Sequence, residues 1–199
     1  MVKFITSRLR RFRRDDEGTI VVEAMLFFPL LLSSLLMSFV FFDAFRNQAI
    51  NLKANYTVAD AISRETRYIT NNFMTNTWNL HRFLTNSEHL TQLRVSIISY
   101  DSSNGQHRIV WSRARGGGED LDDKPVTRIG LQASDIPVMP NNEILIVVQT
   151  EVVYEPYFNV GLDAFTFKNT SYTRPRFAPD NICYSHSGSE GGRICPLDS

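Results

Sequence analysis

Apolar residues form one continuous stretch near the start of the chain, at residues 19–42. These 24 residues carry a single charge, that of Glu23. A helix rises about 1.5 Å per residue, so the stretch is long enough to cross a hydrocarbon core of about 30 Å. Pro29 lies inside it and lacks a backbone N–H, so we expect a kink or loosened first turns there. The pattern predicts a membrane-spanning helix.

A helical pattern continues beyond this stretch, over residues 43–70. One apolar stripe repeats at alternating spacings of four and three, and a second set of apolar residues widens it. The stripe consists of Phe45, Ala49, Leu52, Tyr56 and Ala59, widened by Ile50, Ala54, Val58 and Ala61. We predict an amphipathic stalk helix, which either packs against partner helices or covers the protein's own sheet.

The second half of the chain shows the period of two that is typical of strands. Residues 93–111 alternate around Asn104-Gly105, which predicts a hairpin with a tight turn. Residues 142–158 form the strongest strand pattern, which ends at Pro156. The face of that strand is expected to contain Ile144, Ile146, Val148, Thr150, Val152 and Tyr154. The remaining expected elements are a partner strand, a weaker helix and a flexible acidic connection, at residues 164–173, 71–90 and 115–125.

Four strands after a long helix predict an α+β fold, with a small antiparallel sheet domain behind the helix. The expected organisation has five parts, which are a basic cytoplasmic leader, a transmembrane helix, an amphipathic stalk helix, an extracytoplasmic α+β domain and a C-terminal tail. They cover residues 1–18, 19–42, 43–70, 71–180 and 181–199.

The charge distribution predicts how the helix is oriented. The chain has 199 residues and a formal net charge of zero, but residues 1–18 hold six basic residues against three acidic ones. Positive flanks stay in the cytoplasm, so the N-terminus is expected inside and the chain beyond about residue 43 outside. The basic excess is confined to the leader, which argues against a nucleic-acid-binding body. A cleaved secretory signal is the competing interpretation, but the apolar run is too long and lacks a small-x-small site after it.

Glu23 is unusual because an ionisable group inside an apolar span is costly. It follows Gly18 and Thr19 in the pattern G-x-x-x-x-E, behind the basic leader. This arrangement resembles the processing site of type IV prepilins and pseudopilins. The resemblance implies that a prepilin peptidase cuts between Gly18 and Thr19, and that Glu23 pairs with the new ammonium or with that of a neighbouring subunit. In the alternative interpretation, Glu23 lies near the cytoplasmic interface and reaches the lipid headgroups.

The wider stretch "RRFRRDDEGTIVVEAMLFFPLLL" resembles the opening of TadE-like proteins (TadE or TadF), the pseudopilins of tight-adherence (Flp) pilus systems. The match runs from Arg8 to Phe45, and "EVVYEPYF" and "SYTRPRF" are similar to later segments of that family. The resemblance implies a pilin-like fold and a minor pseudopilin that acts in pilus assembly, adhesion and biofilm formation. It implies an inner-membrane protein with a periplasmic C-terminal domain. The expected partners are prepilin peptidase, other pilin-like subunits and the assembly platform.

The only two cysteines, Cys183 and Cys195, lie in the C-terminal tail. Outside the cytoplasm we expect them to form a disulfide, which would contribute roughly 3 kcal/mol by closing a short loop. The alternative is two unpaired thiols. A zinc site is not expected, because only His186 lies between them.

Nothing in the sequence predicts an enzyme, a cofactor or a metal site. The histidines are scattered, at positions His81, His89, His107 and His186. Four acidic residues could suggest a calcium loop, but they lack the spacing of an EF-hand, so we expect a solvated loop. These are Glu119, Asp120, Asp122 and Asp123. The alternative function is a signal-anchored extracytoplasmic scaffold or binding protein, in which Gly18 has no role.

Overall fold

The computed structural model describes most of the chain after the expected leader. The described residues are 19–66, 68–87, 89, 91–141, 143–177 and 182–196. The predicted leader and Gly18 therefore lie outside the described residues. Contacts divide the chain into two units, of which the first holds the helix up to Asp43 together with residues 156–162. The second holds residues 44–155 and the chain from Asp163 onward.

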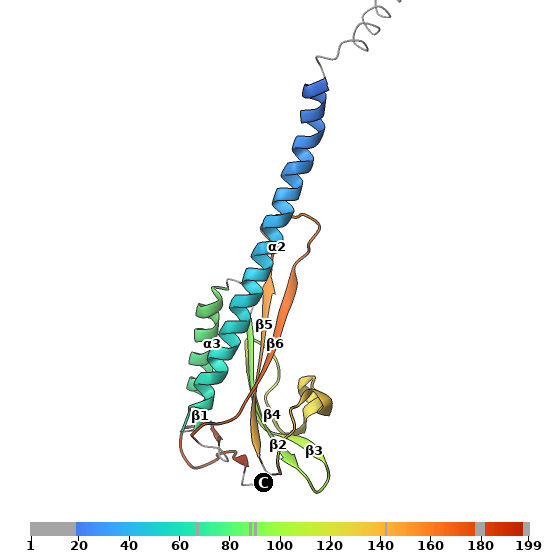
Figure 1. The fold of residues 1–199 in the computed structure, drawn as a ribbon. Helices are drawn as coiled ribbons and strands as arrows, with labels where there is room; N and C mark the ends of the chain where they lie inside the picture. Colours follow the sequence, from blue (N-terminus) through green and yellow to red (C-terminus); the bar gives the residue numbers. More distant parts are fainter. Residues whose placement is uncertain are drawn as a thin grey trace, which may run out of the picture. The chain divides into compact units, whose positions relative to one another are not determined.

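The long helix α2 runs from Thr19 to Ser63 and continues through Pro29 (Figure 1). The predicted end at residue 70 is wrong, because the chain leaves the helix at Ser63. There the backbone N–H of Arg176 donates to the Ser63 carbonyl at 2.8 Å, and the Arg176 side chain lies 2.9 Å from Asp60. The later "RPRF" segment thus satisfies one of the carbonyls that a helix end leaves free.

The main sheet has five strands, and every neighbouring pair is antiparallel. In spatial order they are β4 (Leu121–Pro125), β3 (Gln106–Arg115), β2 (Thr91–Asp101), β5 (Ile144–Tyr154) and β6 (Phe165–Thr173). A long apolar helix followed by a small antiparallel sheet confirms the predicted α+β class. The predicted count of four strands is one too low, since β4 lies in the stretch we expected to be a flexible acidic connection.

Short elements complete the second unit. Helix α3 (Asn71–Thr85) begins where the Thr70 hydroxyl accepts from the N–H of Phe73 at 3.1 Å, as an N-cap does. Strands β1 (Ile69–Thr70) and β7 (Tyr184–Ser185) form a separate parallel pair. Two 3-10 turns, η2 (Val126–Ile129) and η3 (Ala133–Asp135), lie between β4 and β5.

Both faces of the sheet are buried, each in its own cluster. Strand β5 shows this best, because Ile146 and Val148 belong to one cluster whereas Leu145 and Val147 belong to the other. The first cluster includes residues from the helices, namely Val58, Ala59, Ile62 and Met74. The second includes residues around the 3-10 turns, namely Val126, Ile129, Leu131, Ile136 and Met139. The sheet is therefore the middle layer of the second unit, with helices on one face and the turn region on the other.

The face that α2 turns toward the sheet differs from the predicted stripe. Phe45 and Tyr56 are 65% and 57% exposed, whereas Asn51 and Asn55 are buried. Asn55 is buried because its amide N–H groups reach the sheet, at 3.2 Å from the Val148 carbonyl and 3.0 Å from the Thr150 hydroxyl. These bonds offset part of the cost of burying the amide, whose oxygen Oδ1 has no hydrogen-bond partner within the described residues. The prediction is confirmed for Ala54, Val58 and Ala59, which are buried, and it is wrong for Phe45 and Tyr56, because it assigned the buried face by apolar residues alone.

The C-terminal tail is part of the first cluster, although its sequence suggested no core of its own. Ile182, Cys183 and Tyr184 are all at most 5% exposed. The indole N–H of Trp111 donates to the Ile182 carbonyl at 2.9 Å. Cys183 and Cys195 form a disulfide, with their Cα atoms 4.3 Å apart. The backbones of Tyr184 and Ile194 exchange two hydrogen bonds of 2.9 Å just inside it. The disulfide therefore closes a loop that also supplies core residues.

We predict that replacing both cysteines by serine lowers the free energy of unfolding by about 3 kcal/mol, because the unfolded chain gains the freedom of the open loop. Urea unfolding of the full chain in detergent, followed by tryptophan fluorescence, measures this. Ser187→Ala, in the same loop but exposed, is the control and should leave the midpoint unchanged. An unchanged midpoint in the double cysteine variant would contradict the prediction.

One titratable side chain is buried in the fold without a partner. His81, on α3, is fully buried, and neither ring nitrogen has a hydrogen-bond partner. Burial lowers the pKa of His81 from 6.5 to about 4. The unfolded chain binds a proton on this ring at a higher pH than the folded chain does, so acidification between pH 6.5 and 4 favours unfolding.

We therefore predict that acidification from pH 7 to pH 4 lowers the free energy of unfolding by about 3 kcal/mol through the protonation of His81. His81→Leu should remove this part of the pH dependence, because leucine binds no proton in either state. His89→Gln is the control, since His89 is exposed. Urea midpoints at a series of pH values measure the effect, and parallel pH profiles for wild type and His81→Leu would contradict it.

Candidate functional site

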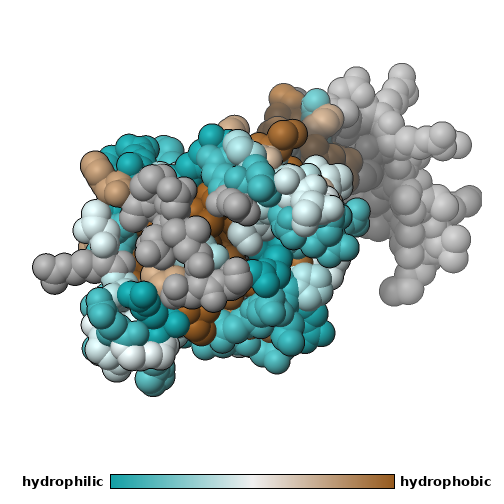
Figure 2. All heavy atoms as spheres, turned by 90° about the horizontal axis from the view of Figure 1, so that it is seen from below, coloured by the Kyte–Doolittle hydropathy of each residue, from teal (hydrophilic) through white to brown (hydrophobic). Residues whose placement is uncertain are grey.

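The apolar part of α2 is the most unusual surface of the chain. Large apolar side chains are exposed along the helix from Ile20 to Phe42, for example Met25 at 78% and Leu31 at 64%. Exposed apolar surface of this size marks an interaction with a membrane or a partner. By length and composition α2 could be a single membrane span or a signal anchor. In contrast, the end of the second unit seen in Figure 2 is mostly hydrophilic.

Glu23 is the only charged residue in this apolar surface, and its side chain is exposed. It lies four positions after Thr19, the first residue of α2, which places the two backbones one turn, or about 6 Å, apart on one face. None of the ion pairs formed within the described chain includes Glu23. The carboxylate is therefore available to a positive charge at the start of the helix or on another molecule.

Pro29 lies two turns further along the exposed helix. Its missing N–H leaves the carbonyl of residue 25 without its usual helical partner. Nearby, the Ser33 hydroxyl donates to the Leu30 carbonyl at 2.9 Å. Such bonds back to the helix let serine residues lie in an apolar environment.

The acidic residues after β3 bind arginine side chains. Asp122 receives two hydrogen bonds from the Arg113 guanidinium, at 2.6 and 3.1 Å, and Asp123 lies 3.1 Å from Arg108. Glu119 lies 3.2 Å from Arg128. No group of three His, Cys, Asp or Glu within the described ranges is arranged to hold a metal ion. The acidic residues are exposed, as expected of a solvated segment, but part of that segment forms β4 (Leu121–Pro125), whose Asp122 and Asp123 pair with arginine residues of β3.

Arg113 links this acidic segment to the C-terminal tail. Its side chain is buried, and its guanidinium lies 4.0 Å from the ring centroid of Tyr184. Burial acts to lower the pKa of Arg113, but the hydrogen bonds and charges of Asp122, Tyr184 and Asp120 outweigh burial and raise it. A buried charge with this many partners holds the edge strand and the tail in one arrangement. The sequence contains a signal for this contact, because the arginine residues of β3 are followed directly by a segment rich in acidic residues.

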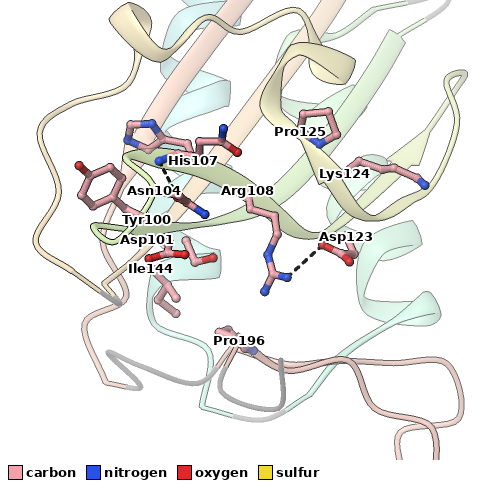
Figure 3. A pocket seen from close by; sticks show the side chains of 12 residues that line it. Tyr100, Asp101, Asn104, His107, Arg108, Asp123, Lys124, Pro125, Ile144 and Pro196 are labelled. Carbon is pink, nitrogen blue, oxygen red and sulfur yellow. Dashed lines mark hydrogen bonds and ion pairs between the residues drawn. The ribbon is translucent and has the colours of Figure 1, made fainter.

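A cavity of about 600 Å³ lies at the end of the β2–β3 hairpin (Figure 3). Its lining includes Asp101, His107, Arg108, Asp123 and Lys124. Arg108 and Asp123 point toward one another and form an ion pair, and Asp101 accepts hydrogen bonds from Ser103 that lower its pKa. The opposite charges largely neutralise each other. The cavity therefore offers polar contacts to a small ligand, without a strong field for either sign of charge.

Comparison with protein-family models, with curated proteins and with solved structures finds no match for this chain. The exposed apolar helix with its single carboxylate is therefore the feature from which a function is argued.

Proposed function

We propose that this chain is a TadE-like minor pseudopilin of a tight-adherence pilus system. One observation carries the proposal, which is that Glu23 is exposed on an otherwise apolar helix, one turn after Thr19. A span that served only as an anchor would gain nothing from a carboxylate here, because an intramembrane charge costs free energy. The carboxylate has a role if an ammonium is created at Thr19.

Cleavage after Gly18 creates that ammonium. The peptidase removes the basic leader, and Thr19 becomes the first residue of α2. The ammonium and the Glu23 carboxylate then lie on one helix face, or meet across two helices when subunits pack together. A pair of opposite charges in an apolar medium loses much less free energy than each charge does alone. The pairing therefore favours the association of helices from different subunits over separate helices in the membrane.

The rest of α2 supports a role in assembly. Its exposed apolar side chains suit lipid before assembly and other apolar helices after it. The helix continues without interruption into the domain that carries the sheet. The domain, which we place in the periplasm, would contact the assembly platform or other pilin-like subunits.

The first test of the proposal is the N-terminus of the mature chain. In cells that contain the cognate prepilin peptidase, we expect a mass that corresponds to a chain beginning at Thr19. Gly18→Val should remain uncut, because the β-branched side chain adds bulk at the scissile position and removes the backbone freedom of glycine. Ser33→Ala, within the span, should be cut normally. An intact leader in cells with active peptidase would overturn the cleavage step.

The second test concerns the charge of Glu23. Glu23→Gln should insert into the membrane normally, but it leaves the Thr19 ammonium unpaired. Because breaking a buried pair costs about 3 kcal/mol or more, we expect the affinity for other pilin-like subunits, measured by co-purification, to fall by roughly a hundredfold or more. Ser33→Ala is the matched control, since it removes a polar group from the same helix without changing its charge. Wild-type recovery of partners with Glu23→Gln would contradict the pairing.

A second candidate function is a signal-anchored binding protein of an envelope complex. The cavity at the hairpin end favours it, because its polar lining could hold a small ligand. In that case the leader stays on the chain and Gly18→Val changes nothing. The N-terminal mass therefore separates the two candidates.

A further inference from the structure

The loop between β5 and β6, residues 156–162, belongs to the same compact unit as the exposed part of α2. In Figure 1 the loop lies alongside the helix. The rings of Phe158 and Phe39 meet edge to face, with centroids 6.2 Å apart and planes at 65°. Edge-to-face contact is a favourable arrangement for two aromatic rings. The loop is therefore packed on the membrane helix at the level of Phe39.

The composition of the loop differs from that of an ordinary surface loop. The seven residues "PYFNVGL" carry no charge and are flanked directly by Glu155 and Asp163. Tyr157 is 77% exposed and Phe158 is 46% exposed, so the aromatic side chains are only partly covered by the protein itself. The exposed tips of surface loops commonly carry small or polar residues. Two adjacent exposed aromatic residues indicate a surface that something else covers.

The depth of the contact identifies what covers it. Phe39 lies 20 residues after Thr19, which is about 30 Å along the helix axis. This distance equals the thickness of a hydrocarbon core of about 30 Å. The next charged side chains of α2, Asp43 and Arg46, come just beyond. Phe39 and the loop therefore lie at the outer boundary between acyl chains and headgroups, where tyrosine and tryptophan are enriched.

We propose that loop 156–162 is a second membrane-contacting element, which lies in the outer lipid interface with Tyr157 and Phe158 against headgroups and acyl chain ends. Close to Phe39 in the sequence, α2 also exposes large apolar side chains, since Phe41 and Phe42 are 46% and 75% exposed. Irregular backbone is unfavourable in the hydrocarbon core but is satisfied by water and headgroups at the interface. The loop would fix the depth of α2 in the bilayer. This inference needs only that α2 spans a membrane, and it holds whether or not the chain is a pilus subunit.

The test uses one environment-sensitive NBD fluorophore on a single added cysteine in the full-length chain. Cys183 and Cys195 are joined in a disulfide and do not react. The label is placed by Tyr157→Cys in the loop, by Val138→Cys as the water-exposed control and by Leu31→Cys as the control within the span. Val138 is a suitable control because it is also a large apolar loop residue and is 93% exposed. The chain is reconstituted in vesicles of phosphatidylethanolamine and phosphatidylglycerol, with or without brominated acyl chains.

We expect brominated lipid to quench the probes at positions 157 and 31 and to leave the probe at 138 unchanged. Aqueous iodide should quench the probe at 138 several-fold more strongly than the probe at 157. If iodide reaches 157 as readily as 138 while lipid quenches 31, the loop proposal is wrong and the span remains. Shielding of 157 from both quenchers would mean that a protein, such as a second copy, covers the loop, which also overturns the proposal. If brominated lipid does not quench the probe at position 31, both the membrane span and the loop proposal are wrong.

Discussion

The backbone of α2 forms its hydrogen bonds within the helix, apart from the one that Pro29 removes, and the exposure of the apolar part of α2 depends on this. Hydrocarbon offers no partner for a free N–H or C=O group, so a chain that crosses it has to remain helical. The same helix then continues to Ser63, whose carbonyl accepts a hydrogen bond from the backbone N–H of Arg176. Along that one helix the burial of apolar side chains changes, from exposed residues such as Leu31 to a protein core around Ala54 and Val58.

Polar contacts, more than apolar area, decide how the elements of the second unit fit together. Asn55 binds a carbonyl and a hydroxyl of β5, and Arg113 binds β4 and lies on Tyr184. Each of these groups is buried, so it is costly in any arrangement that lacks its partners. Apolar side chains tolerate small shifts between a helix and a sheet, but these groups do not. They select one register for the helix and one position for the tail.

Periodicity predicted those elements whose side chains match their environment. The alternation in β5 and the Asn104-Gly105 turn predicted the central strands, and the unbroken apolar run predicted α2. Strand β4 was missed because "LDDKP" has a poor strand composition and is held by Arg108 and Arg113 from the neighbouring strand. The predicted helix face included the buried Ala54, Val58 and Ala59 but not Asn55, whose hydroxyl partner Thr150 lies 95 residues later in the chain. Such pairings depend on the tertiary arrangement and leave no local pattern. Of the candidate site, Glu23 and the cysteines could be named in advance, whereas the contact of Phe39 with Phe158 could not.

The buried position of Ile182 and Tyr184 has a consequence for the order in which the molecule is made. Strand β1 pairs with β7, so the partner of Ile69, which is Tyr184, lies more than a hundred residues later in the chain. A ribosome makes the helices and β1 before it makes β7. The core around Trp111, which includes Ile182 and Tyr184, can therefore close only after residue 184 has been made. Until then the growing chain exposes unfinished apolar surface, and the disulfide of Cys183 with Cys195 forms later still, so it secures a tail that has already docked.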